Sequence, residues 1–537
     1  MVLSALTALR PGRRGIFAAL AYPVGWAAGE LPVQAIVIEA AAFAVLWWWG
    51  WPRTQALSVV VIVLGSIVVL ENLILIVAQF LAQKIVRRDL ASSPRQPLVL
   101  PRAKDDAFGT WWRTMLQIPF HPRDMQLIHN IAYGPEMRHR LDVWRMSTTP
   151  SNAPVIFYVH GGAWTFGDKR EQGRPMLHEF VRRGWVAVAC NYRLAPTYAW
   201  PAQIEDVTRT LAWIKKYIGS YGGDPGRVVV SGGSAGGHLA ALLALSADDP
   251  TWRPKDVEGV TDWSVRGCIS MYGVLEMTGD ETHWHGLGRG LRILLEQRVV
   301  QQPYSQFPEL YEQMSPFHRI GLDAPPFLVV QGANDTLVDV HVARDFVEQF
   351  RRVALSPIYY VELPLTQHAF DVSASPRTSA TVRATVAFAT SVVESAPVMT
   401  ASLMADYSAP PTELMVELSE SRSVDARQAA RELGPFWVLT ADNPYSDHFD
   451  EATNAARRAE LNDVLERHGV VRRPSVARDA TDSWPDEHGF AVFGTTEDFV
   501  RHVAKVFDQF AYYFVDDVTI KVRRSDGQVA LGEDHVH

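Results

Sequence analysis

A serine between glycines stands where the chain changes from an apolar strand pattern to a helix pattern. The run 227–230 predicts a β-strand, residues 232–236 read Gly-Gly-Ser-Ala-Gly, and the run 238–245 predicts a helix rich in Ala and Leu. Such a turn pushes the serine out of the backbone, and the flanking glycines allow strand and helix to pack closely. A glycine-rich turn without chemistry is the alternative, because the pattern also occurs by chance. The flanking elements favour a nucleophile elbow with Ser234 as the nucleophile.

A second glycine motif follows an earlier strand pattern. The run 154–159 predicts a buried strand, and His160-Gly161-Gly162-Ala163-Trp164 follows it directly. A serine nucleophile needs donors for the oxyanion, and glycines after a strand let backbone N–H groups point into a cavity. We therefore expect Gly161, Gly162 and Ala235 to form an oxyanion hole. An ordinary Gly-Gly turn is the alternative.

Candidates for the acid and the base follow two later strand patterns, at 325–330 and 358–363. Asp335 comes after the first and is the candidate acid, while Asp339 is a rival that also suits a helix N-cap. His368 comes after the second and is the candidate base. Serine, aspartate and histidine thus follow one another in the chain order of the α/β-hydrolases.

The region from about 131 to 396 resembles the hormone-sensitive-lipase-like branch of the α/β-hydrolases, which are carboxylesterases and lipases. The resemblance implies an α/β fold with a mostly parallel central sheet flanked by helices. It also implies ester hydrolysis through an acyl-enzyme on a Ser234–His368–Asp335 triad. The motifs that carry it are His160-Gly161-Gly162, Asn191 to Pro196, Trp200-Pro201-Ala202, Glu205-Asp206, Gly223-Asp224-Pro225 with Arg227, and Ser234 to Gly237.

Two positions depart from the family pattern. Ala163 stands where a third glycine is usual, and Gly233 stands where an acidic residue is common. The same two motifs also resemble those of arylformamidases and feruloyl-type esterases. A serine carboxylesterase or lipase is our prediction, an arylformamidase or amidase on the same triad is the alternative, and a non-catalytic membrane scaffold is a third possibility. The triad requires no cofactor and no metal, and His283 and His285 are interpreted as an exposed loop pair.

The N-terminal region has the composition of a membrane anchor. The runs 31–51 and 56–81 are each long enough to cross a bilayer as a helix, and tryptophans end the first run. Glu39 and Glu71 interrupt the runs, and we expect them to face the partner helix or lie near an interface. A buried hairpin in a soluble protein is the alternative.

The charges that flank these runs predict the topology. Basic residues precede the first run and follow the second, which favours two spans with both ends and the catalytic domain in the cytoplasm. A third span at 16–28, which Pro23 interrupts, would move the catalytic domain to the other side. We therefore predict an integral membrane protein.

Composition limits the partners and the redox chemistry. The net charge of −8 offers no basic face for nucleic acid, so we expect a small-molecule or lipid-derived ester as substrate and a membrane as partner. Protein partners are not assigned. Cys190 and Cys268 lie in apolar strand patterns and are predicted to be buried and unpaired.

The C-terminal region changes character and predicts a small α+β unit. It resembles a bacterial domain family of unknown function over about 433–516, and Asn443, Ser446, Trp484 and Glu487 are its candidate site residues, with caps and turns as the alternative. The predicted organisation is a membrane anchor at 1–90, a linker with an amphipathic or cap helix at 91–125, an α/β-hydrolase domain at 126–396 with a cap insert at 276–320, a linker at 397–412, and the α+β domain at 413–537.

Overall fold

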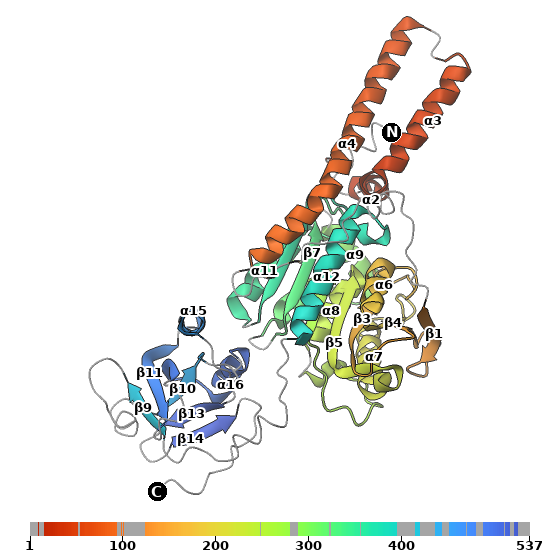
Figure 1. Cartoon of the computed structure of the whole chain (residues 1–537). Helices are drawn as coiled ribbons and strands as arrows, with labels where there is room; N and C mark the ends of the chain where they lie inside the picture. Colours follow the sequence, from red (N-terminus) through yellow and green to blue (C-terminus); the bar gives the residue numbers. More distant parts are fainter. Residues whose placement is uncertain are drawn as a thin grey trace. The chain divides into compact units, whose positions relative to one another are not determined.

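The computed structural model describes most of the chain and divides it into two units. The first unit comprises residues 1–351 with 357–394, and the second comprises residues 352–356 with 395–537 (Figure 1). The continuous described segments are 16–51, 54–93, 124–246, 249–279, 288–321, 324–354, 356–394, 414–418, 435–442, 450–468, 470–479, 487–507, 511–515 and 520–524. Residues 9, 98, 100 and 509 are described as single positions.

An eight-stranded sheet lies at the centre of the first unit. Its strands are β1 (Met125–Ala132), β2 (Arg140–Met146), β3 (Ala153–Val159), β4 (Val186–Cys190), β5 (Gly223–Gly233), β6 (Gly267–Met271), β7 (Phe327–Gly332) and β8 (Ile358–Leu363). The spatial order is β1-β2-β4-β3-β5-β6-β7-β8. β2 pairs antiparallel with both β1 and β4, and all later pairs are parallel. This is the α/β-hydrolase fold, and the predicted fold class is confirmed.

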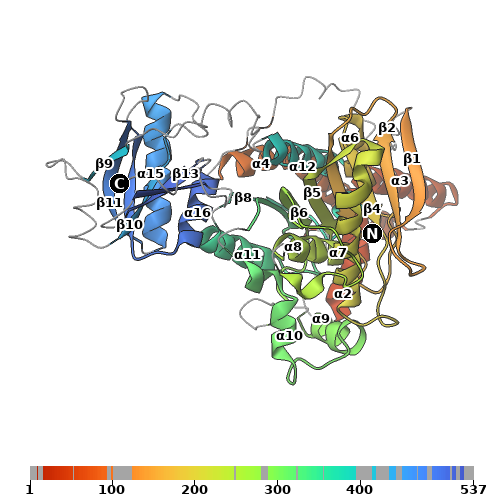
Figure 2. The ribbon, with the colours of Figure 1, turned by 90° about the horizontal axis from the view of Figure 1, so that it is seen from below.

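Helices cover both faces of this sheet (Figure 2). One face packs against α4 (Gln55–Ala91), α6 (Arg174–Arg182) and α12 (Pro376–Glu394), and the other packs against α7 (Ala202–Tyr217), α8 (Ala235–Ala244) and α11 (Val340–Val353). Every residue of β4 and β6 is buried, because both faces are covered. These two strands contain Cys190 and Cys268, which are buried and unpaired as predicted.

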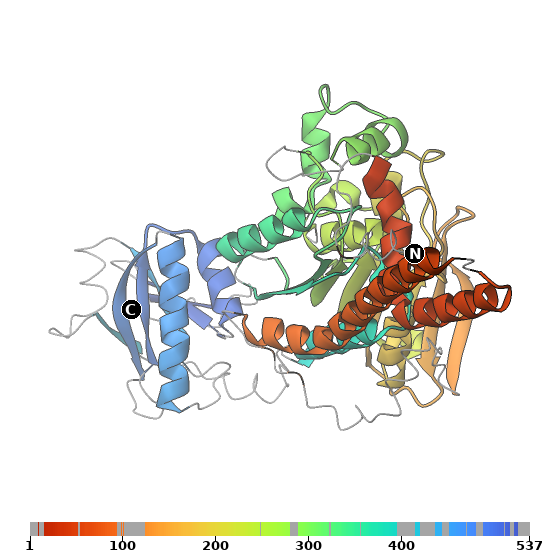
Figure 3. The ribbon, with the colours of Figure 1, turned by 90° about the horizontal axis from the view of Figure 1, so that it is seen from above.

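The N-terminal part of this unit is a helical hairpin joined to a third helix. α3 (Pro32–Trp48) and α4 lie side by side (Figures 1 and 3). α2 (Ile16–Glu30) precedes them, and its part from Ala21 is bent by 93° relative to α3. α4 is long and apolar enough to cross a membrane, with a mean hydropathy of 2.8 in its most apolar window. Only 22% of that window is buried, so most of its apolar surface faces outward.

α4 continues beyond the predicted span of 56–81 and enters the core of the hydrolase unit. Ala82, Val86 and Leu90 pack in the same buried cluster as Phe180 of α6 and Phe388 of α12. Their spacing of four residues places them on one face of the helix. This face is the one that packs against the hydrolase core. One continuous helix therefore joins the apolar hairpin to the hydrolase core.

An insert between β6 and β7 contains two short helices. They are α9 (Gly288–Leu294) and α10 (Pro308–Gln313), and they fall in the range predicted as a cap. His283 and His285 lie outside the described residues, as do residues 101–123 of the predicted linker and amphipathic or cap helix at 91–125.

The described residues of the second unit form a six-stranded antiparallel sheet and two helices. Its strands are ordered β14-β13-β10-β12-β11-β9, and α15 (Glu451–Arg467) and α16 (Glu497–Val506) contribute Leu461 and Val500 to its buried interior. Asn443, Ser446 and Trp484 lie outside the described residues, and Glu487 begins β12. The strands are β9 (Leu414–Leu418), β10 (Phe436–Thr440), β11 (Val471–Asp479), β12 (Glu487–Phe493), β13 (Ala511–Val515) and β14 (Ile520–Arg524).

Candidate active site

The strand–turn–helix around Ser234 forms as the sequence predicts. β5 ends at Gly233, α8 begins at Ala235, and Ser234 between them has φ 56° and ψ −121°. A positive φ at a non-glycine residue is strained and is common at functional turns. The Ser234 N–H donates to the carbonyl of Met271 (2.9 Å), and its own carbonyl accepts from the N–H of His238 (3.0 Å). Two neighbouring elements therefore hold the serine in this conformation.

His368 and Asp335 lie in direct contact. His368 Nδ1 donates to Asp335 Oδ2 at 2.7 Å, and both side chains are buried. Because the carboxylate can only accept, Nδ1 carries the proton and Nε2 is free to act as a base. The rival Asp339 instead accepts from the N–H of His341 (3.0 Å) at the start of α11. The structure thus pairs the histidine with Asp335.

The Asp335 carboxylate is fully satisfied by hydrogen bonds. Oδ1 accepts from the N–H groups of Leu337 (2.8 Å) and Val338 (2.9 Å), and Oδ2 also accepts from Gln331 Nε2 (3.0 Å). These donors fix the plane of the carboxylate and so fix the imidazole that it orients. Buried charges are stable in proteins when they are hydrogen-bonded in this way.

Tyr272 links the serine turn to His368. It follows Met271, its ring centroid lies 4.7 Å from that of His368, and a Cβ built on Gly233 would lie 2.7 Å from Tyr272 Oη. No hydrogen bond between Ser234 Oγ and His368 occurs among the described residues. In free enzymes a hydrogen bond between the nucleophile and its base often forms only when substrate is bound, so its absence does not exclude His368 as the base.

Behind His368 lies a second buried carboxylate. Tyr272 Oη donates to Asp371 Oδ1, and burial raises the pKa of Asp371 above its ordinary value. Burial and the neighbouring Asp371 charge also raise the pKa of Tyr272. Sequence reasoning did not identify this pair. The sequence shows that Asp371 lies three residues after His368. It does not show the contact with Tyr272, which depends on the packing of β6 against the histidine loop.

The predicted oxyanion loop lies beside the serine, with one change in its donors. A Cβ on Gly161 would lie 3.2 Å from Ser234 Cβ, which shows how closely the loop approaches. The Gly161 N–H donates to Gln172 Oε1 at 2.8 Å, so this predicted donor already has a partner. In the part of the chain that the structure describes, no hydrogen bond uses the N–H of Gly162, Ala163 or Ala235.

Two buried histidines support this loop. His160 Nδ1 donates to the carbonyl of Gly161 (2.7 Å), and its ring stacks on Tyr192. His238 Nδ1 accepts from Trp164 Nε1 (3.2 Å), and its Nε2 donates to the carbonyl of Met314 (2.7 Å). Burial lowers the pKa of each histidine to about 4, so both are neutral at neutral pH. Their hydrogen bonds therefore hold the loop without a change of charge at neutral pH.

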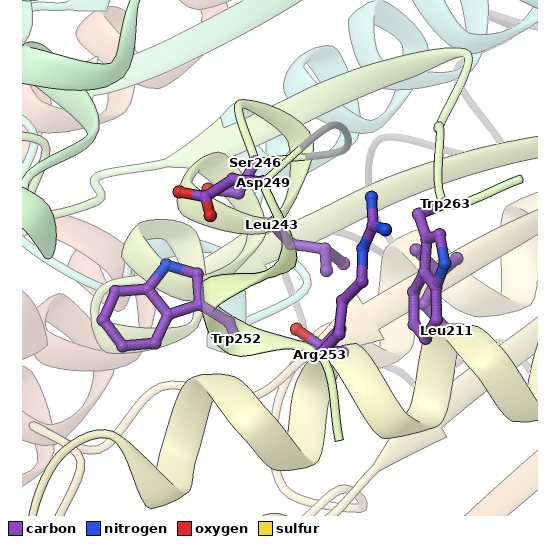
Figure 4. Close-up of a pocket in the computed structure, with 8 residues that line it drawn as sticks. Leu211, Leu243, Ser246, Asp249, Trp252, Arg253 and Trp263 are labelled. Carbon is purple, nitrogen blue, oxygen red and sulfur yellow. The ribbon is translucent and has the colours of Figure 1, made fainter. Parts of the chain in front are cut away.

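A small cavity lies apart from these residues (Figure 4). Its volume of about 10 Å³ admits about one water molecule. Neither Ser234, Asp335 nor His368 lines it, so it does not serve the serine. No cluster of three or more metal-ligating side chains occurs among the described residues. The cavity is lined by Thr208, Leu211, Leu243, Ser246, Asp249, Trp252, Arg253 and Trp263.

Parts of the chain are similar to known families and proteins. A family model described as BD-FAE matches residues 141–350, and one described as a protein of unknown function (DUF3293) matches residues 439–511. The probable carboxylic ester hydrolase LipM of Mycobacterium tuberculosis is 43% identical over 269 residues, which are 50% of this chain and 61% of LipM. Esterase LipC of the same organism is 37% identical over 273 residues, 50% of this chain and 66% of LipC.

A mammalian relative and a solved structure also match part of the chain. Arylacetamide deacetylase of Bos taurus is 45% identical over 100 residues, 18% of this chain and 25% of that protein. A truncated carbohydrate esterase from gut microbiota aligns with 50% of this chain and 96% of its own, at 18% identity and a TM-score of 0.43. The chain spans less than two thirds of the length of LipM and LipC.

Fold and site together define an α/β-hydrolase with a serine at the elbow. Within this class, the hydrolase part of the chain is similar to esterases such as LipM and LipC, and the stretch that matches the DUF3293 model follows it.

Proposed function

We propose that this protein is a membrane-anchored serine hydrolase of carboxylic esters. The observation that carries the proposal is the 2.7 Å hydrogen bond from His368 to Asp335, next to a serine on a strained strand-to-helix turn. His368 Nε2 removes the proton as Ser234 Oγ attacks the acyl carbonyl. It then returns this proton to the leaving alcohol as the acyl-enzyme forms. Water, activated by the same nitrogen, releases the acid and restores the serine.

The oxyanion of each tetrahedral intermediate needs donors that are already in place. We assign this role to the N–H groups of Gly162, Ala163 and Ala235, and we replace the predicted Gly161 because its N–H is bonded to Gln172. Ala235 is the first residue of α8, so the helix N-terminus adds a favourable partial charge. Removing one oxyanion donor typically lowers kcat by roughly a hundredfold or more.

The ester class of the substrate is supported by the relatives, which are named as a carboxylic ester hydrolase and an esterase. We propose a small-molecule or lipid-derived ester. The relative named arylacetamide deacetylase favours a second candidate, in which an aryl amide is cleaved by the same residues. Turnover of short aryl esters compared with N-formyl and N-acetyl aryl amides distinguishes the two.

The membrane part of the proposal comes from the hairpin of α3 and α4. Its outward side chains are apolar, and exposing them to water would cost about 25 cal/mol per Å². Trp48 and Trp49 at its tip are 87% and 75% exposed, which suits a membrane interface. We propose two spans with both ends in the cytoplasm. The exposed apolar residues include Val59, Ile62, Val63, Leu70, Ile74 and Val77.

Covalent labelling by a fluorophosphonate tests the proposed chemistry. We expect the full chain to be labelled and the Ser234→Ala variant to lose both labelling and hydrolysis of p-nitrophenyl butyrate. Ser220→Ala is the matched control, because Ser220 is exposed on the surface. Labelling that persists in Ser234→Ala would refute the proposal.

The pH profile is a second test. We expect activity to fall at acid pH, because a histidine base can accept the serine proton only in its neutral form. A flat profile from about pH 5 to 8 would exclude a histidine base.

A further inference from the structure

The loop that carries His368 has a strained backbone. It connects β8 to α12, and two of its non-glycine residues, Leu365 (φ 52°) and Ala369 (φ 54°), lie in the left-handed region. A non-glycine residue in this region is strained and persists only when neighbouring structure holds it. The position of His368 therefore depends on what packs against this loop.

α2 provides much of that packing. Trp26 Nε1 donates to the carbonyl of Ala369 at 3.0 Å, directly after the histidine. The ring of Tyr22, one turn earlier on the same helix, meets the His368 ring edge to face, with 6.1 Å between their centroids. Leu365 packs against the cluster that Ala28, near the end of α2, forms with Leu75 of α4. A single helix thus contacts both strained residues and the imidazole between them.

α2 is in turn held on both sides by fixed parts of the unit. Glu30 forms a buried ion pair with Arg377 of α12. Gln79 of α4 donates through Nε2 to the carbonyl of Gly29 at 2.7 Å, and Leu75 of α4 packs on Ala28. The helix therefore connects the apolar hairpin, through α4, to the histidine loop.

We infer that α2 is a positioning element for the catalytic base, and that Trp26 and Tyr22 are its positioning residues. The hairpin, which holds α2 through Gln79 of α4, then contributes to turnover in addition to anchoring the protein. This inference rests on the proposed function. Its mechanical part, that α2 restrains the loop at 364–372, holds independently of any catalysis and is measured separately.

Substitution of Trp26 by Phe tests the inference in the full-length protein in detergent micelles. The change keeps an aromatic ring and removes the N–H that the Ala369 carbonyl accepts. We expect kcat for p-nitrophenyl butyrate to fall roughly tenfold, because small misplacements of a catalytic group are costly. KM should change less than about twofold, since a residue that acts through His368 affects chemistry and not binding. Fluorophosphonate labelling should slow in parallel.

The matched control is Trp48→Phe, because Trp48 is exposed at the end of α3 and contacts no part of the histidine loop. This variant should keep wild-type kcat and labelling. Gln79→Leu is a second test variant, since it loosens α2 from α4 without touching the loop. It should lower kcat in the same direction, and it decides the question if Trp26→Phe does not fold.

Hydrogen exchange of the peptide that covers 364–372 separates this inference from the proposed function. Faster exchange in Trp26→Phe and Gln79→Leu, but not in Trp48→Phe, supports the positioning role even if the wild type is not labelled at Ser234. Folded Trp26→Phe and Gln79→Leu proteins with wild-type exchange, kcat and labelling rate would overturn the inference.

Discussion

His238 shows how one residue can link two distant segments of the chain. Its Nδ1 accepts from Trp164 in the turn after β3, and its Nε2 donates to the carbonyl of Met314, which follows α10 in the insert between β6 and β7. Only the neutral ring can make both bonds, because a protonated ring would turn a second N–H towards the indole N–H of Trp164. His160, on the other side of the loop, is likewise buried and neutral.

These two histidines predict a loss of stability in acid. Their pKa values are lowered to about 4 in the folded state, while an unfolded histidine titrates at about 6.5. Between these values the unfolded state binds more protons, so the free energy of unfolding falls as pH falls from about 6.5 to 4. Each histidine contributes at most about 1.4 kcal/mol per pH unit.

Urea unfolding at pH 7 and pH 4.5 measures this effect. The His238→Gln variant carries no titrating group at this position, so its free energy of unfolding should depend less on pH than that of the wild type. Equal pH dependence in the two proteins would contradict the prediction, whatever their difference at pH 7.

At the scale of residues, motif and chain order predict a triad of Ser234, Asp335 and His368, and the structure contains the predicted contact between His368 and Asp335. The pairing of Asp335 with His368 followed because both come after strands that end at the same edge of a parallel sheet. Gln172 and Asp371 could not be found this way. Their partners, the Gly161 N–H and Tyr272 Oη, are set by loop conformations that no local pattern specifies.

The element that most depends on its exact residues is the junction of β5 and α8. A Cβ on Gly236 would lie 2.1 Å from the carbonyl oxygen of Val159, and a Cβ on Gly232 would lie 2.3 Å from that of Gly236. Both contacts are to backbone atoms, which cannot rotate away. The glycines are therefore needed so that strand and helix can approach closely, and not only to allow the backbone conformation of the turn.

Substitution of Gly236 by Ala should thus be severe. We expect the free energy of unfolding to fall by about 3 kcal/mol or more, because the methyl group must displace β3 or α8. Gly219→Ala is the matched control. Gly219 lies in the short helix Ile218–Tyr221 and has open space where a Cβ would be, so its substitution should change stability by less than about 0.5 kcal/mol. Urea denaturation monitored by tryptophan fluorescence compares the two variants.

Most elements of the hydrolase core could be predicted from their apolar runs. The predicted strands at 154–159, 325–330 and 358–363 correspond to β3, β7 and β8 within two residues at either end. The end of α4 could not be predicted, because charged residues after position 81 hide a buried face that only its packing against α12 reveals.

At the scale of the whole molecule, α4 belongs to two environments along one helix. Leu70 is 59% exposed on the outward side, while Leu90 is completely buried in the core that includes the sheet. The apolar hairpin and the hydrolase unit are therefore not independent modules joined by a flexible linker.

Two alanine substitutions in this helix should differ sharply. Leu90→Ala should lower the free energy of unfolding of the hydrolase unit by roughly 2–5 kcal/mol, as is typical of a cavity in a packed core. Leu70→Ala should leave it nearly unchanged. Thermal unfolding of the full chain in detergent, followed through loss of p-nitrophenyl butyrate hydrolysis, measures both. Equal effects would show that the end of α4 does not contribute to the core.

The two cysteines of the central sheet can report when the sheet opens, because they react only when they are exposed. Burial raises the pKa of Cys190 to about 12 and that of Cys268 well above its ordinary value, so neither forms a thiolate in the folded state at neutral pH. Alkylating dyes should therefore leave the native enzyme unmodified. Their rate of incorporation would time how often β4 and β6 separate from their neighbours, without any engineered probe.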